Sequence, residues 1–226
     1  MLNPEKYLDE VELLEFGVNH EARCACVLLL DTSSSMKGEP IKKLNEGYKL
    51  LLDTLKKDRL AVLRVELSVI VFGGRVQVVQ EFATVDKVNF KPLVSDGSTP
   101  MGEAIKLGVA KLAERKKLYE AASIRRYRPW MFMVTDGEPT DEWKSAASLV
   151  REREKGKHLS FFAVGVEGAN MSVLKQMSVR SPVHLKGLDF TEMFTWLSTS
   201  LSAVADSGLG ANAQLRPVDS WGSVST

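Results

Sequence analysis

The sequence predicts an α/β fold: a doubly wound, mostly parallel sheet with one antiparallel edge strand and helices on both faces. Two observations predict it. Short apolar runs that are typical of buried strands alternate along the chain with segments of helical periodicity, which is the pattern of a parallel sheet covered by helices. In addition, Gly73-Gly74 directly joins two strand-like segments, which predicts a hairpin and therefore an antiparallel strand.

The first strand is expected at 23–31, where Arg-Cys-Ala-Cys-Val-Leu-Leu-Leu-Asp is apolar almost throughout and stops at an Asp. Such a run is typical of a central strand that is buried on both faces. Cys24 and Cys26 lie two residues apart and therefore share a face of this strand. We interpret them as buried core thiols, because a disulfide between neighbours on one strand would be strained.

The other elements follow in order along the chain. Apolar side chains at helical spacing predict helices over 40–55, 100–119, 141–155, 170–177 and 191–204. Runs rich in β-branched and aromatic residues predict strands over 65–72, 75–82, 128–136, 159–165 and 183–185. We therefore expect an N-terminal extension (1–19), one domain (20–205) and a disordered C-terminal tail (206–226), which is rich in Gly, Ser, Asn and Pro.

Composition is that of an ordinary globular protein. The chain has 226 residues, of which 44% are hydrophobic and 26% are charged, and its net charge is +1. This balance argues against a dedicated nucleic-acid binder, which usually carries a strongly basic domain. The N-terminus lacks the regions of a signal peptide, and no apolar run approaches the roughly 20 residues that span a bilayer. We therefore expect a cytoplasmic protein.

Three loops place oxygen-bearing side chains where the expected sheet would bind a ligand. Asp31, Ser33 and Ser35 follow the first strand, Thr99 precedes the middle helix, and Asp136 follows a later strand. In open parallel sheets, ligands bind outside the carboxyl ends of the strands. Carboxylates and hydroxyls without His or thiolate suit Mg²⁺ or Mn²⁺ rather than Zn²⁺. The sequence therefore predicts a divalent metal site formed by these five residues.

Each loop also has a purely structural interpretation. Asp-Thr-Ser-Ser-Ser is good turn and helix-cap chemistry. Thr99 is a plausible N-cap with Pro100 as the first helical residue. Gly137 is expected to supply a positive φ in the loop after Asp136. It is the conjunction of the three loops at strand ends that favours a metal site over these alternatives.

At these residues the sequence resembles von Willebrand factor A (VWA) domains. Asp31-x-Ser33-x-Ser35, Thr99, and Asp136 in a Thr-Asp-Gly context resemble the metal-ion-dependent adhesion site of that family. The resemblance covers roughly residues 20–205 and implies a VWA/Rossmann-like doubly wound fold. It also implies that the three hydroxyls coordinate the metal and that the two carboxylates do so directly or through water. A Glu or Asp of a protein partner would then fill the open coordination position.

Within the family, three motifs are most similar to small bacterial tellurite-resistance-associated members of the TerY type. The motifs are Asp-Thr-Ser-Ser-Ser-Met, Gly-Ser-Thr-Pro-Met-Gly and Val-Thr-Asp-Gly-Glu-Pro-Thr-Asp. This resemblance implies a cytosolic stress-response setting alongside a protein kinase and a PP2C-like phosphatase.

The expected function is a non-enzymatic, Mg²⁺-dependent protein–protein interaction module with no catalytic residues. The alternative is a metal-dependent phosphatase or nuclease on a similar sheet. Such enzymes commonly use an Asp-x-Asp arrangement, whereas position 33 is a serine here, although Glu138 and Asp141 lie close enough in sequence to supply a base.

The basic segment 114–128 has two interpretations: a solvated helix end and loop, or a docking patch for an acidic partner. Nucleic-acid binding through this segment is a third reading, and the net charge of the chain disfavours it.

Overall fold

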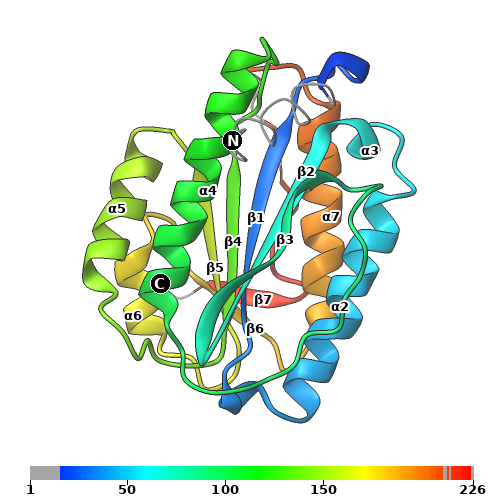
Figure 1. Cartoon of the computed structure of the whole chain (residues 1–226). Helices are drawn as coiled ribbons and strands as arrows, with labels where there is room; N and C mark the ends of the chain where they lie inside the picture. The colour runs from blue at the N-terminus through cyan, green and yellow to red at the C-terminus, as the bar shows by residue number, and fades with distance from the viewer. Residues whose placement is uncertain (1–15, 211–212, 214, 225–226) are drawn as a thin grey trace, which may run out of the picture.

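The computed structural model describes residues 16–210, 213 and 215–224, which form one seven-stranded sheet with helices on both faces (Figure 1). The strands are β1 (Cys24–Asp31), β2 (Val65–Gly73), β3 (Arg75–Thr84), β4 (Trp130–Thr135), β5 (Ser160–Gly165), β6 (Val183–Leu185) and β7 (Gly222–Val224). Their order in the sheet is β3-β2-β1-β4-β5-β6-β7. The pairs β2–β3 and β6–β7 are antiparallel and the others are parallel, which confirms the predicted fold class. The sheet has an antiparallel strand at both edges, however, whereas only the hairpin strand β3 was predicted.

Helices α2 (Glu39–Leu55), α3 (Ala61–Arg64) and α7 (Phe190–Asp206) cover one face of the sheet, and α4 (Met101–Ala121), α5 (Lys144–Lys155) and α6 (Met171–Met177) cover the other (Figure 1). A 3₁₀ turn, η1 (Ser34–Met36), follows β1. The five predicted helices are present, whereas α3 and η1 are too short to show a periodicity in the sequence. Within the described part of the chain, no helix has both the length and the apolar character needed to cross a membrane.

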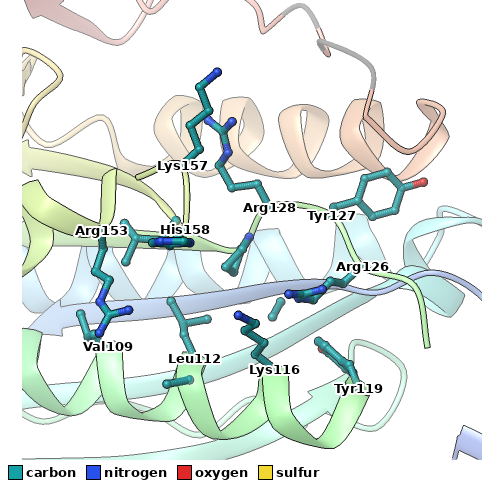
Figure 2. A pocket seen from close by; sticks show the side chains of 14 residues that line it. Val109, Leu112, Lys116, Tyr119, Arg126, Tyr127, Arg128, Arg153, Lys157 and His158 are labelled. Atoms are coloured by element: carbon teal, nitrogen blue, oxygen red, sulfur yellow. The ribbon is translucent and has the colours of Figure 1, made fainter. Parts of the chain in front are cut away.

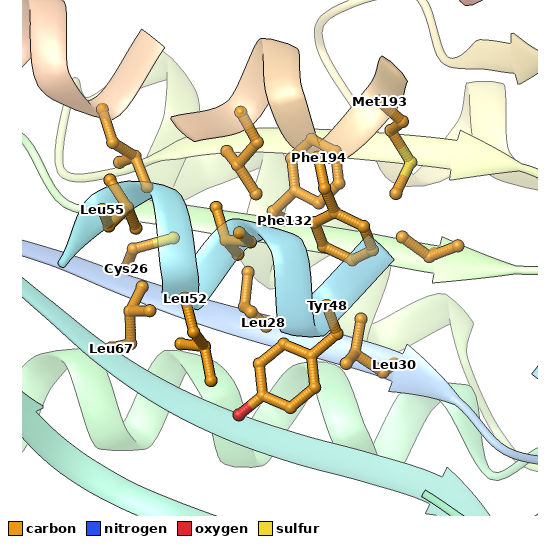
Figure 3. Packing of buried hydrophobic residues seen from close by; sticks show 14 of the residues in the cluster. Cys26, Leu28, Leu30, Tyr48, Leu52, Leu55, Leu67, Phe132, Met193 and Phe194 are labelled. Atoms are coloured by element: carbon orange, nitrogen blue, oxygen red, sulfur yellow. The ribbon is translucent and has the colours of Figure 1, made fainter. Parts of the chain in front are cut away.

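The central strand β1 is buried along its whole length and contributes to two cores. Cys24, Cys26 and alternate residues face α2 and α7, and the residues between them face α4. Figure 3 shows the first of these cores, in which side chains of β1 pack against Leu52 and Leu55 of α2 and Phe194 of α7. Both thiols are free and buried, as predicted. Burial raises the pKa of Cys24 to about 12, and the nearby carboxylate of Glu66 contributes to this rise.

The C-terminal segment differs from the expectation of disorder. Residues 222–224 form β7, in which Val224 pairs with Val183 of β6. Trp221 is buried, and its ring lies 5.5 Å from the ring of Trp196. The expected disorder is therefore wrong for the described part of this segment, because one buried tryptophan anchors a stretch that shows no periodicity. Residues 211–212, 214 and 225–226, and residues 1–15 of the expected N-terminal extension, lie outside the described residues.

The order of the strands places the switch point of the sheet between β1 and β4. After β1 the chain builds β2 and β3 on one side, and it then returns to place β4 on the other side of β1. Leu30 pairs with Val134, so the next residues of the two strands, Asp31 and Thr135, end side by side. Adjacent strands that lead in opposite directions leave a crevice at their carboxyl ends, which is where this fold class binds ligands.

Candidate functional site

Two carboxylates lie at the switch point. Asp31 is the last residue of β1 and is fully buried, and Asp136 directly follows β4 and is 9% exposed. The Asp31 carboxylate accepts hydrogen bonds from the N–H of Ser33 at 2.8 Å and from the Thr135 hydroxyl at 2.5 Å. Burial raises the pKa of Asp31 to about 6; these donors oppose the rise and the neighbouring Asp136 adds to it. Burial also raises the pKa of Asp136. A cation at this point would stabilise both anions.

The three predicted hydroxyls lie at the same edge of the sheet. The Ser35 hydroxyl donates to Asp136 Oδ1 at 2.8 Å and lies 2.9 Å from the hydroxyl of Ser33. Thr99 reaches the site from another loop: a Cβ added at Gly137 would lie 3.4 Å from Thr99 Oγ1 and 3.9 Å from Asp31 Oδ2. The structure thus brings together all five residues that the sequence singled out.

The expectation for Gly137 is wrong, because this residue is not among the glycines with positive φ. Its lack of a side chain instead keeps open the space between Thr99 and Asp31, which both lie within 4 Å of the position a Cβ would take.

Backbone hydrogen bonds hold the loops of the site against one another. The N–H of Ser34 donates to the Gly97 carbonyl at 2.9 Å, and the N–H of Asp96 donates to the Thr32 carbonyl at 2.7 Å. The turn of the β2–β3 hairpin packs against the same loop, where a Cβ on Gly97 would lie 2.3 Å from Gly74 Cα. Since Gly97 also has a φ of 68°, a side chain there would be both strained and blocked.

The start of α4 shows that Thr99 is not a helix cap. The helix begins at Met101, and the N–H groups of the next two residues donate to the carboxylate of Asp141 at 2.9 and 2.7 Å. The predicted cap at Thr99, with Pro100 as the first helical residue, is therefore wrong. Thr140 fixes Thr99 instead through two hydrogen bonds to its backbone, of 3.0 and 2.9 Å. These contacts orient Thr99 without using its hydroxyl.

Three residues that support the site were not predicted from the sequence. Thr135 had a signal, because it is the polar end of an otherwise apolar strand and its hydroxyl binds Asp31. Thr140 and Asp141 lie in a motif noted in the sequence, but their supporting role had no local signal, because the backbone groups that they bind lie 38–41 residues away.

The donor set fits a hard divalent cation. Two carboxylates and three hydroxyls supply oxygen alone, which is the chemistry that Mg²⁺ and Mn²⁺ prefer. Throughout the described residues, no three His, Cys, Asp or Glu side chains gather as ligands. A metal at this edge would therefore depend on hydroxyls as well as on Asp31 and Asp136.

Solved structures with the same fold come from several sources. One is a von Willebrand factor type A protein from Catenulispora acidiphila, with a TM-score of 0.58 and 15% identity over 80% of this chain and 43% of that one. Another is the pilus adhesin SpaC from Lactobacillus rhamnosus GG, with a TM-score of 0.62 and 13% identity over 82% of this chain and 31% of that one. A third is the conserved hypothetical protein BatB from Bacteroides thetaiotaomicron, with a TM-score of 0.55 and 17% identity over 81% of this chain and 100% of that one.

This chain therefore spans less than half of the first two proteins. At these identities the likeness shows the fold, and no curated protein matches the chain in sequence. The sequence profile of the von Willebrand factor type A domain matches residues 26–192, which is well over half of the chain. The chain belongs to the von Willebrand factor type A domain family.

Proposed function

We propose that this VWA domain, of a class that generally serves in protein interactions, is a non-enzymatic module that binds a protein partner through a divalent cation. The proposed ligands of Mg²⁺ or Mn²⁺ are the five residues Asp31, Ser33, Ser35, Thr99 and Asp136. The observation that carries the proposal is their convergence: side chains up to 105 residues apart in sequence meet at one edge of the sheet.

The charge of the site is compatible with an acidic partner, because Asp31 and Asp136 would neutralise a divalent cation without adding an excess of negative charge. Asp31 and Asp136 supply two negative charges, and the three hydroxyls supply none. A bound cation would act as a Lewis acid toward an oxygen from outside the chain, and a partner's Glu or Asp is the side chain with the matching charge. We propose that one such residue provides the metal-dependent part of the affinity and that contacts with the surrounding loops provide specificity.

Glu138 and Asp141, the two residues that could serve as the base of a hydrolase, both accept hydrogen bonds that hold parts of the fold in place. Glu138 accepts a hydrogen bond from the Asn170 side-chain amide at 2.7 Å. Asp141 accepts two N–H groups at the start of α4. These contacts favour the interaction module over a metal-dependent phosphatase or nuclease.

We further propose a cytoplasmic stress response as the setting, with a protein kinase and a PP2C-like phosphatase as candidate partners. This part of the proposal rests on the resemblance of the three site motifs to tellurite-resistance proteins of the TerY type.

The test measures metal binding and partner binding on the same variants. Titration of the metal-free chain with Mn²⁺ should give one site per chain, and Asp31→Ala or Thr99→Ala should weaken it at least about tenfold, as for lost ligands. Capture of protein partners from a lysate should be lost with EDTA and with either variant. The matched control is Asp53→Ala, since Asp53 is exposed on α2 and pairs with Lys49 away from the site.

Circular dichroism should show that the three variants keep their helical content. Unchanged Mn²⁺ affinity in both site variants, or capture that survives EDTA, would contradict the proposal. Mg²⁺-dependent hydrolysis of p-nitrophenyl phosphate that Asp31→Ala abolishes would instead favour the enzyme.

A further inference from the structure

A second concave site lies at the opposite edge of the sheet from the five proposed metal ligands. It is a cavity of about 310 Å³ between α4 and α5, at the amino-terminal ends of β1, β4 and β5 (Figure 2). We call it the basic pocket and define it by Lys116, Tyr119, Arg126, Arg153 and His158 with the apolar residues beneath them. Its volume lies at the lower end of the range for small-molecule sites.

The floor of the basic pocket is apolar and firmly held. Val109, Leu112 and Tyr119 are buried and recur at helical spacing, so they share one face of α4, and Leu159 faces them from the start of β5. The Tyr119 hydroxyl donates a hydrogen bond of 2.6 Å to the buried Glu66. The floor therefore offers a fixed apolar surface to the non-polar part of a ligand.

The rim of the pocket is cationic and is built from separate elements. Lys116 comes from α4, Arg126 from the loop before β4, and Arg153 from α5. Figure 2 shows these three side chains reaching toward the space between the helices, whereas Lys157 and Arg128 extend away from it. All three are exposed. The arrangement concentrates positive charge in one place on a chain whose net charge is +1.

One carboxylate competes for this charge. Glu120 lies 3.1 Å from Arg126 and 3.7 Å from Lys116, and it is 54% exposed. Such exposed pairs contribute little to stability and open readily. For Arg153, the described residues offer no carboxylate within salt-bridge distance. Lys116, Arg126 and Arg153 together with Glu120 carry a net charge of +2, and Arg128 and Lys157, which also line the cavity but extend away from it, add two further positive charges.

His158 is placed over the pocket by the turn that follows α5. A Cβ on Gly156 would lie 2.8 Å from His158 Cδ2, so the glycine provides the space that the ring occupies. The N–H of His158 donates to the Arg153 carbonyl at 2.8 Å, which links the turn to the end of the helix. The turn thus holds an additional hydrogen-bonding group beside the three cations.

We infer that the basic pocket binds a phosphorylated ligand whose aromatic or aliphatic group rests on the apolar floor. A phosphoryl group carries a charge of about −1.5 to −2 and three acceptor oxygens, which suits a site where three cations reach into the cavity and two more stand at its edge. Arginine binds phosphate oxygens in a bidentate manner, and two of the three cations are arginines.

The test is isothermal titration calorimetry of the full chain with phenyl phosphate. We expect saturable binding at least about tenfold tighter than that of inorganic phosphate, because the ring would bury apolar surface against the floor. Lys116→Ala and Arg153→Ala should each weaken binding about tenfold, as for the loss of one charge-assisted hydrogen bond. Glu120→Gln should strengthen binding by up to about fivefold, because it removes the competing carboxylate.

The matched control is Lys117→Ala, which removes the same charge from the next residue of α4 but not from the pocket. It should leave the affinity within about twofold. An effect of Lys117→Ala as large as that of Lys116→Ala would show non-specific attraction and overturn the inference. So would the absence of saturable binding at millimolar phenyl phosphate, or equal affinity for inorganic phosphate.

Two further experiments complete the test. The first distinguishes a modified protein from a small molecule as the ligand, and the second distinguishes the phosphate proposal from the metal proposal. A tyrosine-phosphorylated peptide that binds at least tenfold more tightly than phenyl phosphate would assign the pocket to a modified protein, and the reverse order would assign it to a small molecule. Either result supports a phosphate site. Asp31→Ala should leave phenyl phosphate binding unchanged, so failure at one edge of the sheet is distinguishable from failure at the other.

Discussion

Two of the regions in which the molecule buries acidic side chains differ in what surrounds the carboxylates. Glu66 lies near the start of β2 and is 1% exposed. Its carboxylate accepts hydrogen bonds from Arg23 Nε at 3.0 Å, Arg115 Nε at 2.7 Å and the Tyr119 hydroxyl at 2.6 Å. At the other edge of the sheet, Asp31 and Asp136 meet hydroxyl and N–H donors but, among the described residues, no Lys or Arg within salt-bridge distance.

This difference separates a structural carboxylate from a candidate binding pair. A buried charge is tolerated when oppositely charged groups surround it, and Glu66 has two such groups within the chain. The pKa of Asp31 is raised because burial and Asp136 both oppose its ionisation. The chain itself therefore neutralises one acidic cluster with its own cations, whereas the proposed metal ion would neutralise the other.

The largest expected effect comes from breaking the cluster around Glu66. Glu66→Gln would remove the buried carboxylate that the guanidinium groups of Arg23 and Arg115 share, and we expect a loss of about 3–5 kcal/mol in the free energy of unfolding. Urea denaturation followed by circular dichroism measures this loss. The control Asp53→Asn breaks an exposed pair and should cost less than about 1 kcal/mol. A loss below 1 kcal/mol for Glu66→Gln would contradict the structural role.

The second prediction concerns the cluster of Asp31 and Asp136. Asp31→Asn removes one of two like charges and keeps an oxygen that accepts the N–H of Ser33, so the metal-free variant should be at least as stable as the parent chain. At Mg²⁺ concentrations about 100-fold above its dissociation constant, the parent should gain about 2.7 kcal/mol and the variant almost nothing. Urea denaturation with Mg²⁺ and with EDTA measures both quantities. An equal increase in the free energy of unfolding with Mg²⁺ in both chains would show that Asp31 is not a ligand of the metal.

The third prediction concerns the Tyr119 hydroxyl, which is the neutral hydrogen-bond donor to Glu66, and it has a smaller expected effect on stability. Tyr119→Phe removes a hydroxyl hydrogen bond to a carboxylate that keeps both guanidinium partners, so we expect a loss of about 1–2 kcal/mol in the free energy of unfolding. The ring remains, and phenyl phosphate binding in the basic pocket should stay within about twofold of the parent value. A loss as large as that of Glu66→Gln would show that the hydroxyl, rather than the guanidinium groups, completes the cluster.

The last prediction concerns Cys24 and Cys26, whose thiols we expect to react very little in the native chain. The pKa of Cys24 is raised to about 12 and that of Cys26 well above its usual value, mainly by burial. Because the thiolate is the reactive form, raising the pH from 7 to 9 should produce little labelling of the native chain by a disulfide reagent. Labelling should become complete in denaturant. Rapid labelling at pH 8 in native buffer would show that this end of the core opens.

Much of the fold follows from local patterns, because the elements concerned carry their own signals. The apolar run that ends at Asp31 marks a central strand, and the Gly73-Gly74 pair marks the hairpin. The short strand β7 carries no such signal, since its position depends on Trp221 packing against the distant Trp196. Local periodicity cannot report a segment that is held by contacts with distant residues, here by Trp221 and by pairing with β6.

The same distinction applies to the candidate site. The five oxygen-bearing residues could be singled out because each follows a strand or precedes a helix in a recognisable motif. The residues that orient them could not, since Asp141 caps a helix that begins 40 residues earlier in the sequence. Glu66 was missed for the same reason: its three partners lie 43–53 residues away from it.

The path of β1 through the molecule has a consequence for how many molecules the domain can hold at once. The strand has eight residues, which at about 3.3 Å per residue gives a length of about 25 Å. Its first residues lie near the basic pocket, and its last residue is Asp31. A ligand in the basic pocket and a ligand at Asp31 would lie on opposite sides of the folded core, so both could be bound at the same time. Under the two proposals, the domain would hold a protein partner and a phosphorylated ligand at a fixed separation.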